Sequence, residues 1–177
     1  MSATSEPVQV REASGDDLDA IRRIYNEGIE DRIATLETAP KTEAEIREWW
    51  AQHGARFVVL VALAKDAEIA GWASLNPFSH RCAHAAIADL SVYVSRNLRG
   101  HGMGAVLLSA IEPFALKHEF RKIVLHALNK NEAGKRLYRR LGYEEVGVFR
   151  QHGKLEGEFV DVVAMEKILP ALRARPE

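Results

Sequence analysis

The chain has 177 residues, 47% hydrophobic and 28% charged, which suits one globular domain with a full core. Its formal net charge of -1 argues against a nucleic-acid partner, because such proteins usually carry a basic excess. A single cysteine, Cys82, excludes an intramolecular disulfide, and the longest apolar run, 57–64, is far too short to span a membrane. Residues 1–7 lack the apolar core of a signal peptide, so we expect a cytoplasmic protein with no membrane partner.

Hydrophobic periodicity and turn residues predict eleven regular elements. In chain order they are a strand at 8–12, a helix at 18–29, a helix after Thr42, strands at 57–63, 69–75 and 86–94, a helix at 103–117, a strand at 122–128, a helix at 131–141, and strands at 143–150 and 159–167. This order predicts an α/β chain with a mixed sheet flanked by helices. With no linker or repeat, we expect one domain over residues 8–169 and dispensable ends on either side.

Local signals set several helix ends. Thr42 and Glu45 have the spacing of a capping box, and Gly142 follows its helix as a C′ glycine does. Pro113 lies inside the helix expected at 103–117, where proline costs about 3 kcal/mol, so a kink or a split is expected there.

A glycine-rich turn, Arg99-Gly100-His101-Gly102-Met103-Gly104, lies between the strand ending at Val94 and the following helix. Such a turn can bind an anion, because backbone N–H groups point outward at the helix start and glycines let a phosphate approach the backbone. The spacing matches neither the dinucleotide fingerprint nor a P-loop. From this motif alone, a flexible turn without a ligand stays open.

Four ordered segments between Asp89 and Met165 strengthen the anion-binding interpretation. They are Asp89-Leu-Ser-Val-Tyr-Val-Ser95, Arg99-x-x-Gly102-x-Gly104, Asn131-x-x-Gly-x-x-Leu-Tyr-x-x-Leu-Gly-Tyr143, and Phe149-Arg-Gln-His-Gly-Lys154 with Val160-Asp-Val162. Together they resemble the GNAT superfamily of N-acetyltransferases, and among these the phosphinothricin and L-amino acid acetyltransferases. The first half of the chain is similar more diffusely, through Tyr25-Asn26 and Thr35-Leu36-Glu37.

The resemblance implies the GNAT fold, in which two parallel strands, here 86–94 and 122–128, splay apart to admit acetyl-coenzyme A. The residues it implies for coenzyme binding are Val92, Tyr93, Val94, Arg99, Gly100, His101, Gly102, Met103, Gly104, Ala105, Asn131 and Lys135. The N–H of Val92 would also donate to the thioester oxygen, where negative charge grows. The family commonly pairs its subunits, so we expect a homodimer, with Trp49, Trp50 and the C-terminal strands as contributors.

The chemistry requires a base, because an alkyl ammonium ion cannot attack a thioester. Asp89 stands where phosphinothricin acetyltransferases have a glutamate, and its shorter side chain suggests an intervening water or a deeper acceptor. Tyr138, on the helix after the second splayed strand, is the candidate acid for the leaving thiolate. A structural carboxylate and a packing aromatic are the alternatives for these two residues.

The expected acceptor is a small amino acid or an amino-acid-like toxin such as phosphinothricin or methionine sulfoximine. Candidate acceptor-binding residues are Leu36, Glu37, Arg81, His84 and His152. Acetylation of a polyamine or a protein N-terminus, or a coenzyme A sensor without catalysis, stays open.

Other reactive residues fit this scheme less well. Cys82 lacks an obvious base partner for an acyl-enzyme step. His80 and His84 have metal-ligand spacing only if helical, and the stretch after Asn76-Pro77 is not expected to be, so no metal site is predicted. His126 is interpreted as a buried strand residue.

Overall fold

The computed structural model describes residues 8–170, so the interpretation of the two chain ends lies outside the described residues. The helices and strands are β1 (Gln9–Glu12), α1 (Leu18–Glu30), α2 (Glu43–Ala51), β2 (Val59–Leu63), β3 (Ile69–Pro77), β4 (Ile87–Val94), α3 (Met103–Lys117), β5 (Lys122–Leu128), α4 (Glu132–Arg140), β6 (Glu144–Leu155) and β7 (Glu158–Ile168). Their order is the one predicted. Short 3-10 turns lie at Gly15–Asp17, Cys82–His84 and Arg96–Leu98.

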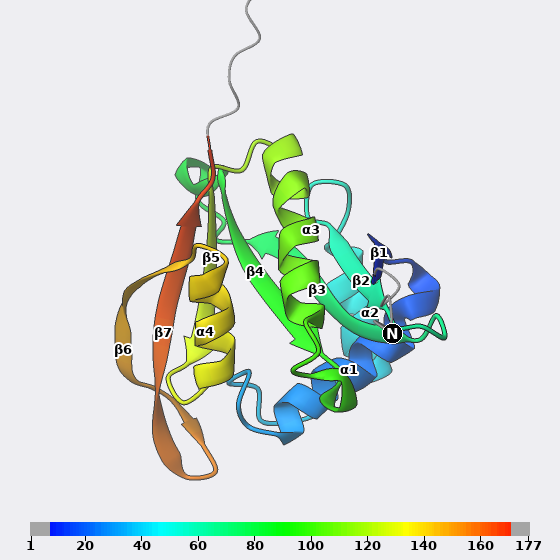
Figure 1. The fold of residues 1–177 in the computed structure, drawn as a ribbon. Helices are drawn as coiled ribbons and strands as arrows, with labels where there is room; N and C mark the ends of the chain where they lie inside the picture. Colours follow the sequence, from blue (N-terminus) through cyan, green and yellow to red (C-terminus); the bar gives the residue numbers. More distant parts are fainter. Residues whose placement is uncertain (1–7, 171–177) are drawn as a thin grey trace, which may run out of the picture.

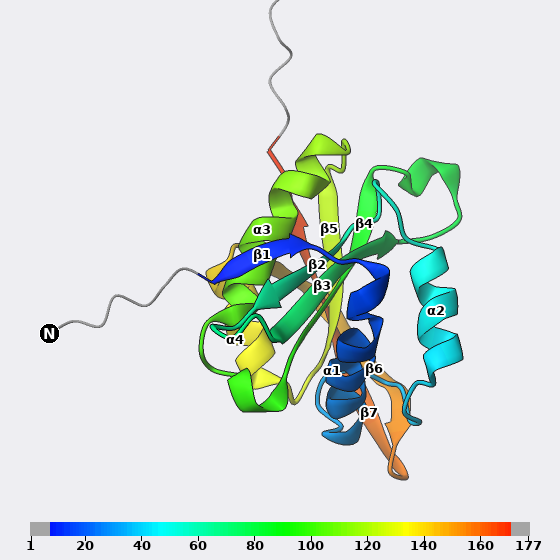
Figure 2. The same cartoon turned by 90° about the vertical axis from the view of Figure 1, so that its right-hand side faces the viewer.

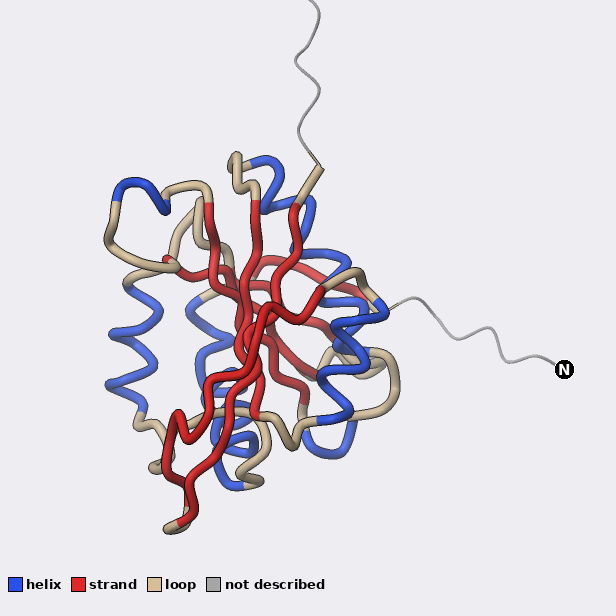
Figure 3. The backbone as a smooth tube through the Cα atoms, turned by 90° about the vertical axis from the view of Figure 1, so that its left-hand side faces the viewer, coloured by secondary structure: helices blue, strands red, loops and turns tan. Residues whose placement is uncertain are grey.

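The seven strands form one sheet in the order β1-β2-β3-β4-β5-β7-β6. Every neighbouring pair is antiparallel except β4 and β5, which are parallel. Helices α3 and α4 cover one face of the sheet, and α1 and α2 cover the other (Figures 1–3). The predicted α/β fold with a mixed, mostly antiparallel sheet is therefore confirmed.

The parallel pair is short. Register between β4 and β5 ends at Asp89 opposite Val124, although β4 runs on to Val94 and β5 to Leu128. Figure 1 shows the two strands diverging beyond this point. The sheet stays intact on both sides, because β3 pairs with β4 up to Val94 and β7 pairs with β5 up to Leu128. The opening is therefore confined to the middle of the sheet.

Alternation along β4 divides its side chains between two cores. Ala88 and Leu90 are buried under α3 with Leu107 and Ile111. Tyr93 packs on the opposite face, in the cluster of α1 residues around Trp72. Asp89 and Ser91 therefore also belong to the face covered by α1 and α2.

Two regular elements differ from expectation. Helix α3 runs from Met103 to Lys117 with Pro113 inside it, so of the kink or split expected there the split is absent. Its buried residues Ile111 and Ala115 lie on either side of the proline, and their packing holds the helix on the sheet. Strand β6 continues to Leu155, beyond the end predicted at residue 150, through an irregularity between Phe149 and Gly153.

The interpretation of His126 was also wrong. Its side chain is 41% exposed, although its neighbours Leu125 and Ala127 are buried. The physical reason is the separation of β4 from β5, which uncovers one face of β5 at this point. None of the helices described between residues 8 and 170 is long and apolar enough to cross a membrane.

Candidate active site

The opening beside β4 exposes unpaired backbone groups. The N–H of Ser95 donates to the carbonyl oxygen of Ala70 on the β3 side at 2.8 Å, and the N–H of Arg121 donates to Ala86 on the β5 side at 2.8 Å. The side to which backbone N–H and C=O groups point alternates from one residue to the next along a strand. Leu90 and Val92 therefore point their backbone groups to the same side as Ala86, which is the side of the opening. The N–H of Val92 is therefore placed to bind a ligand that enters between the strands.

The glycine turn ends in the N-terminus of α3. Gly100 and Gly102 have φ angles of 78° and 87°, in the left-handed region that favours glycine. A Cβ at either position would meet no atom within 4 Å, so the space beside the turn is open. Gly104 differs, since a Cβ there would lie 2.8 Å from Leu137 of α4. Two glycines thus leave room for an anion, and the third lets α3 and α4 approach.

Ion pairs fix this turn to the end of α1. The guanidinium of Arg99 contacts Asp31 and donates through Nε to the Val94 carbonyl at 3.1 Å, and Arg96 bonds to Asp31 and Glu30. Burial alone would raise the pKa of Asp31, but hydrogen bonds from Arg96 and Arg99 lower it overall. The predicted phosphate ligand Arg99 is therefore already paired with a carboxylate.

A cleft of about 690 Å³, called the coenzyme cleft below, follows the glycine turn and the opening between the strands. Predicted coenzyme residues that line it are Val92, Tyr93, Val94, Arg99, Gly100, Gly102, Met103, Gly104, Ala105 and Asn131. The Oδ1 atom of Asn131 caps α4 by accepting from the N–H of Gly134 at 2.9 Å. The open turn, the helix N-terminus and the free backbone of β4 fit a pyrophosphate and an extended amide-containing arm.

Lys135 and His101 do not line this cleft. Lys135 is 5% exposed, and its ammonium bonds to Asn129 at 3.2 Å and Glu132 at 2.7 Å. The cleft side of α4 instead carries Arg136 and Arg140, both exposed. Arg136 and Arg140 are four residues apart, and Ala133, three residues before Arg136, lies on the same helix face. This spacing is the sequence signal that could have identified them.

A second cavity, of about 290 Å³, lies on the face of the sheet covered by α1 and is called the acceptor pocket here. Its lining includes Tyr25, Leu36, Asp89, Ser91, His126 and Val162. It shares Ala34, Val92, Tyr93, Asn131 and Tyr138 with the coenzyme cleft. The two cavities therefore meet at a common wall where the strands separate.

Asp89 and His126 face each other across the opening. The Oδ1 atom of Asp89 lies 3.5 Å from Nδ1 of His126, within ion-pair distance. Their side chains are 31% and 41% exposed, so a ligand in the acceptor pocket can contact both. Sequence reasoning missed His126, because an isolated histidine in an apolar strand usually indicates a core position.

Tyr138 is positioned by the end of α4. Left-handed Gly142 ends the helix, and the N–H of Tyr143 donates to the Tyr138 carbonyl at 3.0 Å, in a Schellman motif. The two tyrosine rings lie 6.2 Å apart, which is the hydrophobic contact of that motif. Burial raises the pKa of Tyr138 to about 12, so its hydroxyl keeps its proton at neutral pH.

The loop at 31–40 closes over the acceptor pocket. Leu36 packs so closely on Gly153 of β6 that a Cβ on the glycine would lie 2.5 Å from the leucine Cδ2. Arg32 of the loop and Glu156, in the turn after β6, form an ion pair at 3.6 Å. Asn26 holds the far end of the loop through two hydrogen bonds to the Lys41 backbone, at 2.7 and 3.1 Å.

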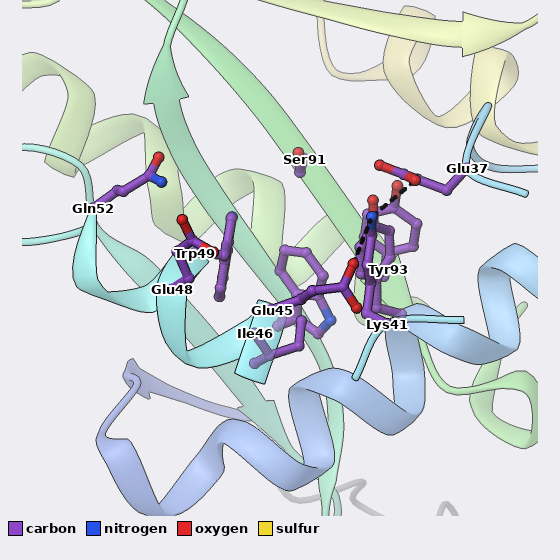
Figure 4. Close-up of a pocket in the computed structure, with 11 residues that line it drawn as sticks. Glu37, Lys41, Glu45, Ile46, Glu48, Trp49, Gln52, Ser91 and Tyr93 are labelled. Atoms are coloured by element: carbon purple, nitrogen blue, oxygen red, sulfur yellow. Dashed lines mark ion pairs between the residues drawn. The ribbon is translucent and has the colours of Figure 1, made fainter. Parts of the chain in front are cut away.

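A third cavity, of about 300 Å³, adjoins the acceptor pocket at Tyr25, Ser91 and Tyr93. Figure 4 shows Lys41 between Glu37 and Glu45, with the ammonium 2.9 Å and 3.9 Å from the two carboxylates. The hydrogen bond to Glu37 raises the pKa of Lys41, and burial raises the pKa of Tyr25. Lys41 is therefore a cation that lines this third cavity and is already paired with carboxylates.

Three predicted acceptor residues line none of these cavities. Arg81 is exposed in the loop after β3. His84 bonds to Ser79 at 2.6 Å and lies 5.1 Å from the ring of Phe78. His152 stacks on Phe149 of β6 at 4.7 Å. Within residues 8–170, no three histidine, cysteine or acidic side chains come together in a way that could hold a metal ion.

Comparison with known proteins agrees with this architecture. A phosphinothricin N-acetyltransferase of Streptomyces coelicolor is 30% identical over 172 residues, which cover 96% of this chain and 100% of that protein. An L-methionine sulfoximine/L-methionine sulfone acetyltransferase of Pseudomonas aeruginosa is 30% identical, covering 94% of this chain and 98% of that protein. A crystal structure of a phosphinothricin acetyltransferase from Sinorhizobium meliloti in complex with acetyl-CoA superposes with a TM-score of 0.88 at 28% identity, covering 96% and 93% of the two chains.

The model of the Acetyltransferase (GNAT) family matches residues 19–143. This span runs from α1 to the end of α4, so it contains β4, the glycine turn and the opening between β4 and β5. The chain is therefore an acetyltransferase that belongs to the GNAT family.

Proposed function

We propose that this chain transfers the acetyl group of acetyl-coenzyme A directly to the amino group of a small amino acid or an amino-acid-like toxin. The observation that carries the proposal is the wall of five residues shared by the coenzyme cleft and the acceptor pocket. A thioester in the cleft and an amine in the pocket would meet there at the short distance that the reaction needs. The names of the relatives supply the acceptor class, phosphinothricin or methionine sulfoximine.

Three residues have distinct proposed roles: Val92 and Tyr138 in the shared wall, and Asp89 in the adjoining acceptor pocket. Asp89 provides the negative charge that draws a proton from the acceptor ammonium, directly or through an intervening group. The N–H of Val92 donates to the thioester oxygen as charge grows on it. Tyr138 donates its proton to the departing thiolate.

A thiol-release assay with the purified chain and acetyl-CoA tests the proposal. Acceptors are phosphinothricin, methionine sulfoximine and methionine sulfone, with spermidine and an alanine-initiated peptide for comparison. We expect the amino-acid analogues to be acetylated fastest, on the α-amine. Turnover with spermidine or the peptide alone would assign a different acceptor class, and coenzyme binding without any turnover would indicate a sensor.

The proposal also places the protein in the cytoplasm as a homodimer. The single cysteine supports a reducing compartment. Exposed apolar side chains on the outermost strand β6, at Val146, Val148 and Phe149, support a subunit contact. A monomeric mass by light scattering at high micromolar concentration would contradict the dimer.

A further inference from the structure

Two ionisable side chains face each other where β4 and β5 separate, and the proposed mechanism so far uses only Asp89. We infer that His126 is the catalytic base that takes the proton from the acceptor ammonium, and that Asp89 holds the imidazole in place. This inference rests on the proposed function and names the group that intervenes between Asp89 and the amine.

Position along the strands favours the histidine. Asp89 is the last residue of β4 paired with β5, opposite Val124. His126 lies two residues further along β5, roughly 6–7 Å in the direction in which the strands open. It is therefore level with the part of β4 that carries the N–H of Val92. Asp89 lies before this level, at the end of the paired part of β4, and its side chain is short.

The facing atoms determine which imidazole nitrogen is free. Nδ1 of His126 lies toward the Asp89 carboxylate, 3.5 Å from Oδ1. A carboxylate at Nδ1 favours the tautomer with the proton on that nitrogen and leaves the Nε2 lone pair available. The same carboxylate stabilises the imidazolium that forms after proton transfer.

Other charged or titratable groups around His126 do not replace Asp89. On the same face of the sheet, Lys122 of β5 is paired with Glu166 of β7. From β6, His152 contacts Phe149, whose ring lies 6.2 Å from that of His126. Tyr25 of α1 and Tyr138 of α4 also line the pocket, and burial raises the pKa of both. Among the described residues that line the acceptor pocket, Asp89 is the one carboxylate.

The proton and electron balance is complete with these groups. The acceptor ammonium gives one proton to Nε2 of His126, and the freed nitrogen lone pair forms the bond to the thioester carbon. As the carbon–sulfur bond breaks, Tyr138 gives a proton to the sulfur and is reprotonated from solvent. The acylated nitrogen loses one of its two remaining protons to solvent and keeps the other as the amide N–H. His126 also returns its proton to solvent, so the net release is one proton for each acetyl group transferred.

The test compares H126Q, D89N and the double variant, using the acceptor that the wild type acetylates best. Each single variant should lower kcat/KM at neutral pH by about 10²-fold, the low end of general-base contributions. Because both residues act on one proton transfer, the double variant should also lose only about 10²-fold. The loss should shrink at high pH, where free amine accumulates. Acetyl-CoA affinity should not change. H118Q, at the end of α3 and outside both cavities, is the control.

Nitrogen-15 NMR of the full chain gives a readout without an acceptor. Neutral His126 should carry its proton on Nδ1 in the wild type and lose this preference in D89N. A proton on Nε2, an unchanged pH–rate profile in H126Q, or losses in the double variant that multiply to about 10⁴-fold would each overturn the inference. If H126Q does not fold, H126N provides the same test. A wild type inactive with every amine would instead refute the proposed function, and the inference with it.

Discussion

The coenzyme cleft and the acceptor pocket share a wall but are built in different ways. Half of the residues that line the cleft come from one stretch of chain, Val92 to Ala105, which contributes backbone groups and glycines. The lining of the acceptor pocket is divided among α1, the 31–40 loop, β4, β5, α4 and β7. The cleft thus depends on local conformation, whereas the pocket depends on how distant segments pack.

This difference predicts which property each substitution should change. A change in the glycine turn should alter coenzyme affinity whatever the acceptor. A change around the acceptor pocket should alter acceptor kinetics and leave coenzyme affinity unchanged. Only the shared wall and the adjoining pair Asp89 and His126 should affect the chemical step itself.

Tyr138→Phe should have the largest effect, because Tyr138 belongs to both cavities. Loss of the proton donor should lower turnover by about 10²-fold with acetyl-CoA affinity unchanged, since the hydroxyl acts mainly as the thiolate departs. Steady-state kinetics with calorimetry would measure both. If the chemical step limits turnover and the variant still turns over at the wild-type rate, Tyr138 is a packing residue and not the proton donor.

Tyr143→Phe is the matched control for this substitution. The Tyr143 hydroxyl is buried without a hydrogen-bond partner, so its removal should leave turnover unchanged and not lower the free energy of unfolding.

Burial raises the pKa of Tyr143, and that of Tyr138 to about 12. Unfolded tyrosine ionises near pH 10, so stability should fall as pH rises above about 10, and each Phe variant should reduce that fall.

Gly102→Val should weaken acetyl-CoA binding by roughly tenfold. A valine at φ 87° strains the backbone by about 1–2 kcal/mol and fills space that is open beside the turn. Calorimetry would measure the dissociation constant, with Gly54→Val as the control, because Gly54 also borders open space but has no positive φ. Unchanged affinity in a folded Gly102 variant would remove the turn from the coenzyme site.

Gly153→Ala should raise the acceptor KM by about fivefold, roughly 1 kcal/mol, and leave coenzyme affinity unchanged. The new methyl group would displace Leu36 from its place over the pocket. Leu36→Ala removes the clash, so the double variant should behave like Leu36→Ala alone. Independent, additive effects would show that the two residues do not act through this contact.

Sequence patterns predicted the cleft well because its parts are contiguous. Each glycine of the turn carried a local signal, and the capping box of Thr42 with Glu45 is present as predicted, with the Thr42 N–H 2.8 Å from the glutamate. Lys135 was predicted to bind the coenzyme, but its neighbour Arg136 lines the cleft, because helix spacing alone does not show which side of α4 faces the opening. The close packing of Leu137 on Gly104 shows that side in the structure.

The acceptor pocket was less predictable, because its contacts join segments far apart in sequence. Asp89 was recognised by family resemblance, but its partner His126 depends on where the parallel pairing stops. Leu36 was named without its contact, since Gly153 lies more than a hundred residues away. Arg81 has the right charge for a carboxylate ligand, yet the loop places it outside the cavities described.

The smallest expected effects are those that distinguish the cleft side of α4, with Arg136 and Arg140, from its buried side, with Lys135. Arg136→Gln and Arg140→Gln should each weaken acetyl-CoA binding by roughly threefold, because exposed cations near phosphates contribute only about 0.5–1 kcal/mol. Added salt should weaken wild-type binding more than binding by the variants, since screening removes the same attraction. Lys135→Gln should leave affinity unchanged and lower stability instead, because its ammonium is held by Glu132 and Asn129 inside the fold. Calorimetry at two salt concentrations and thermal unfolding would measure both properties. A loss of affinity in the lysine variant equal to that in the arginine variants would mean that α4 presents its other side to the coenzyme.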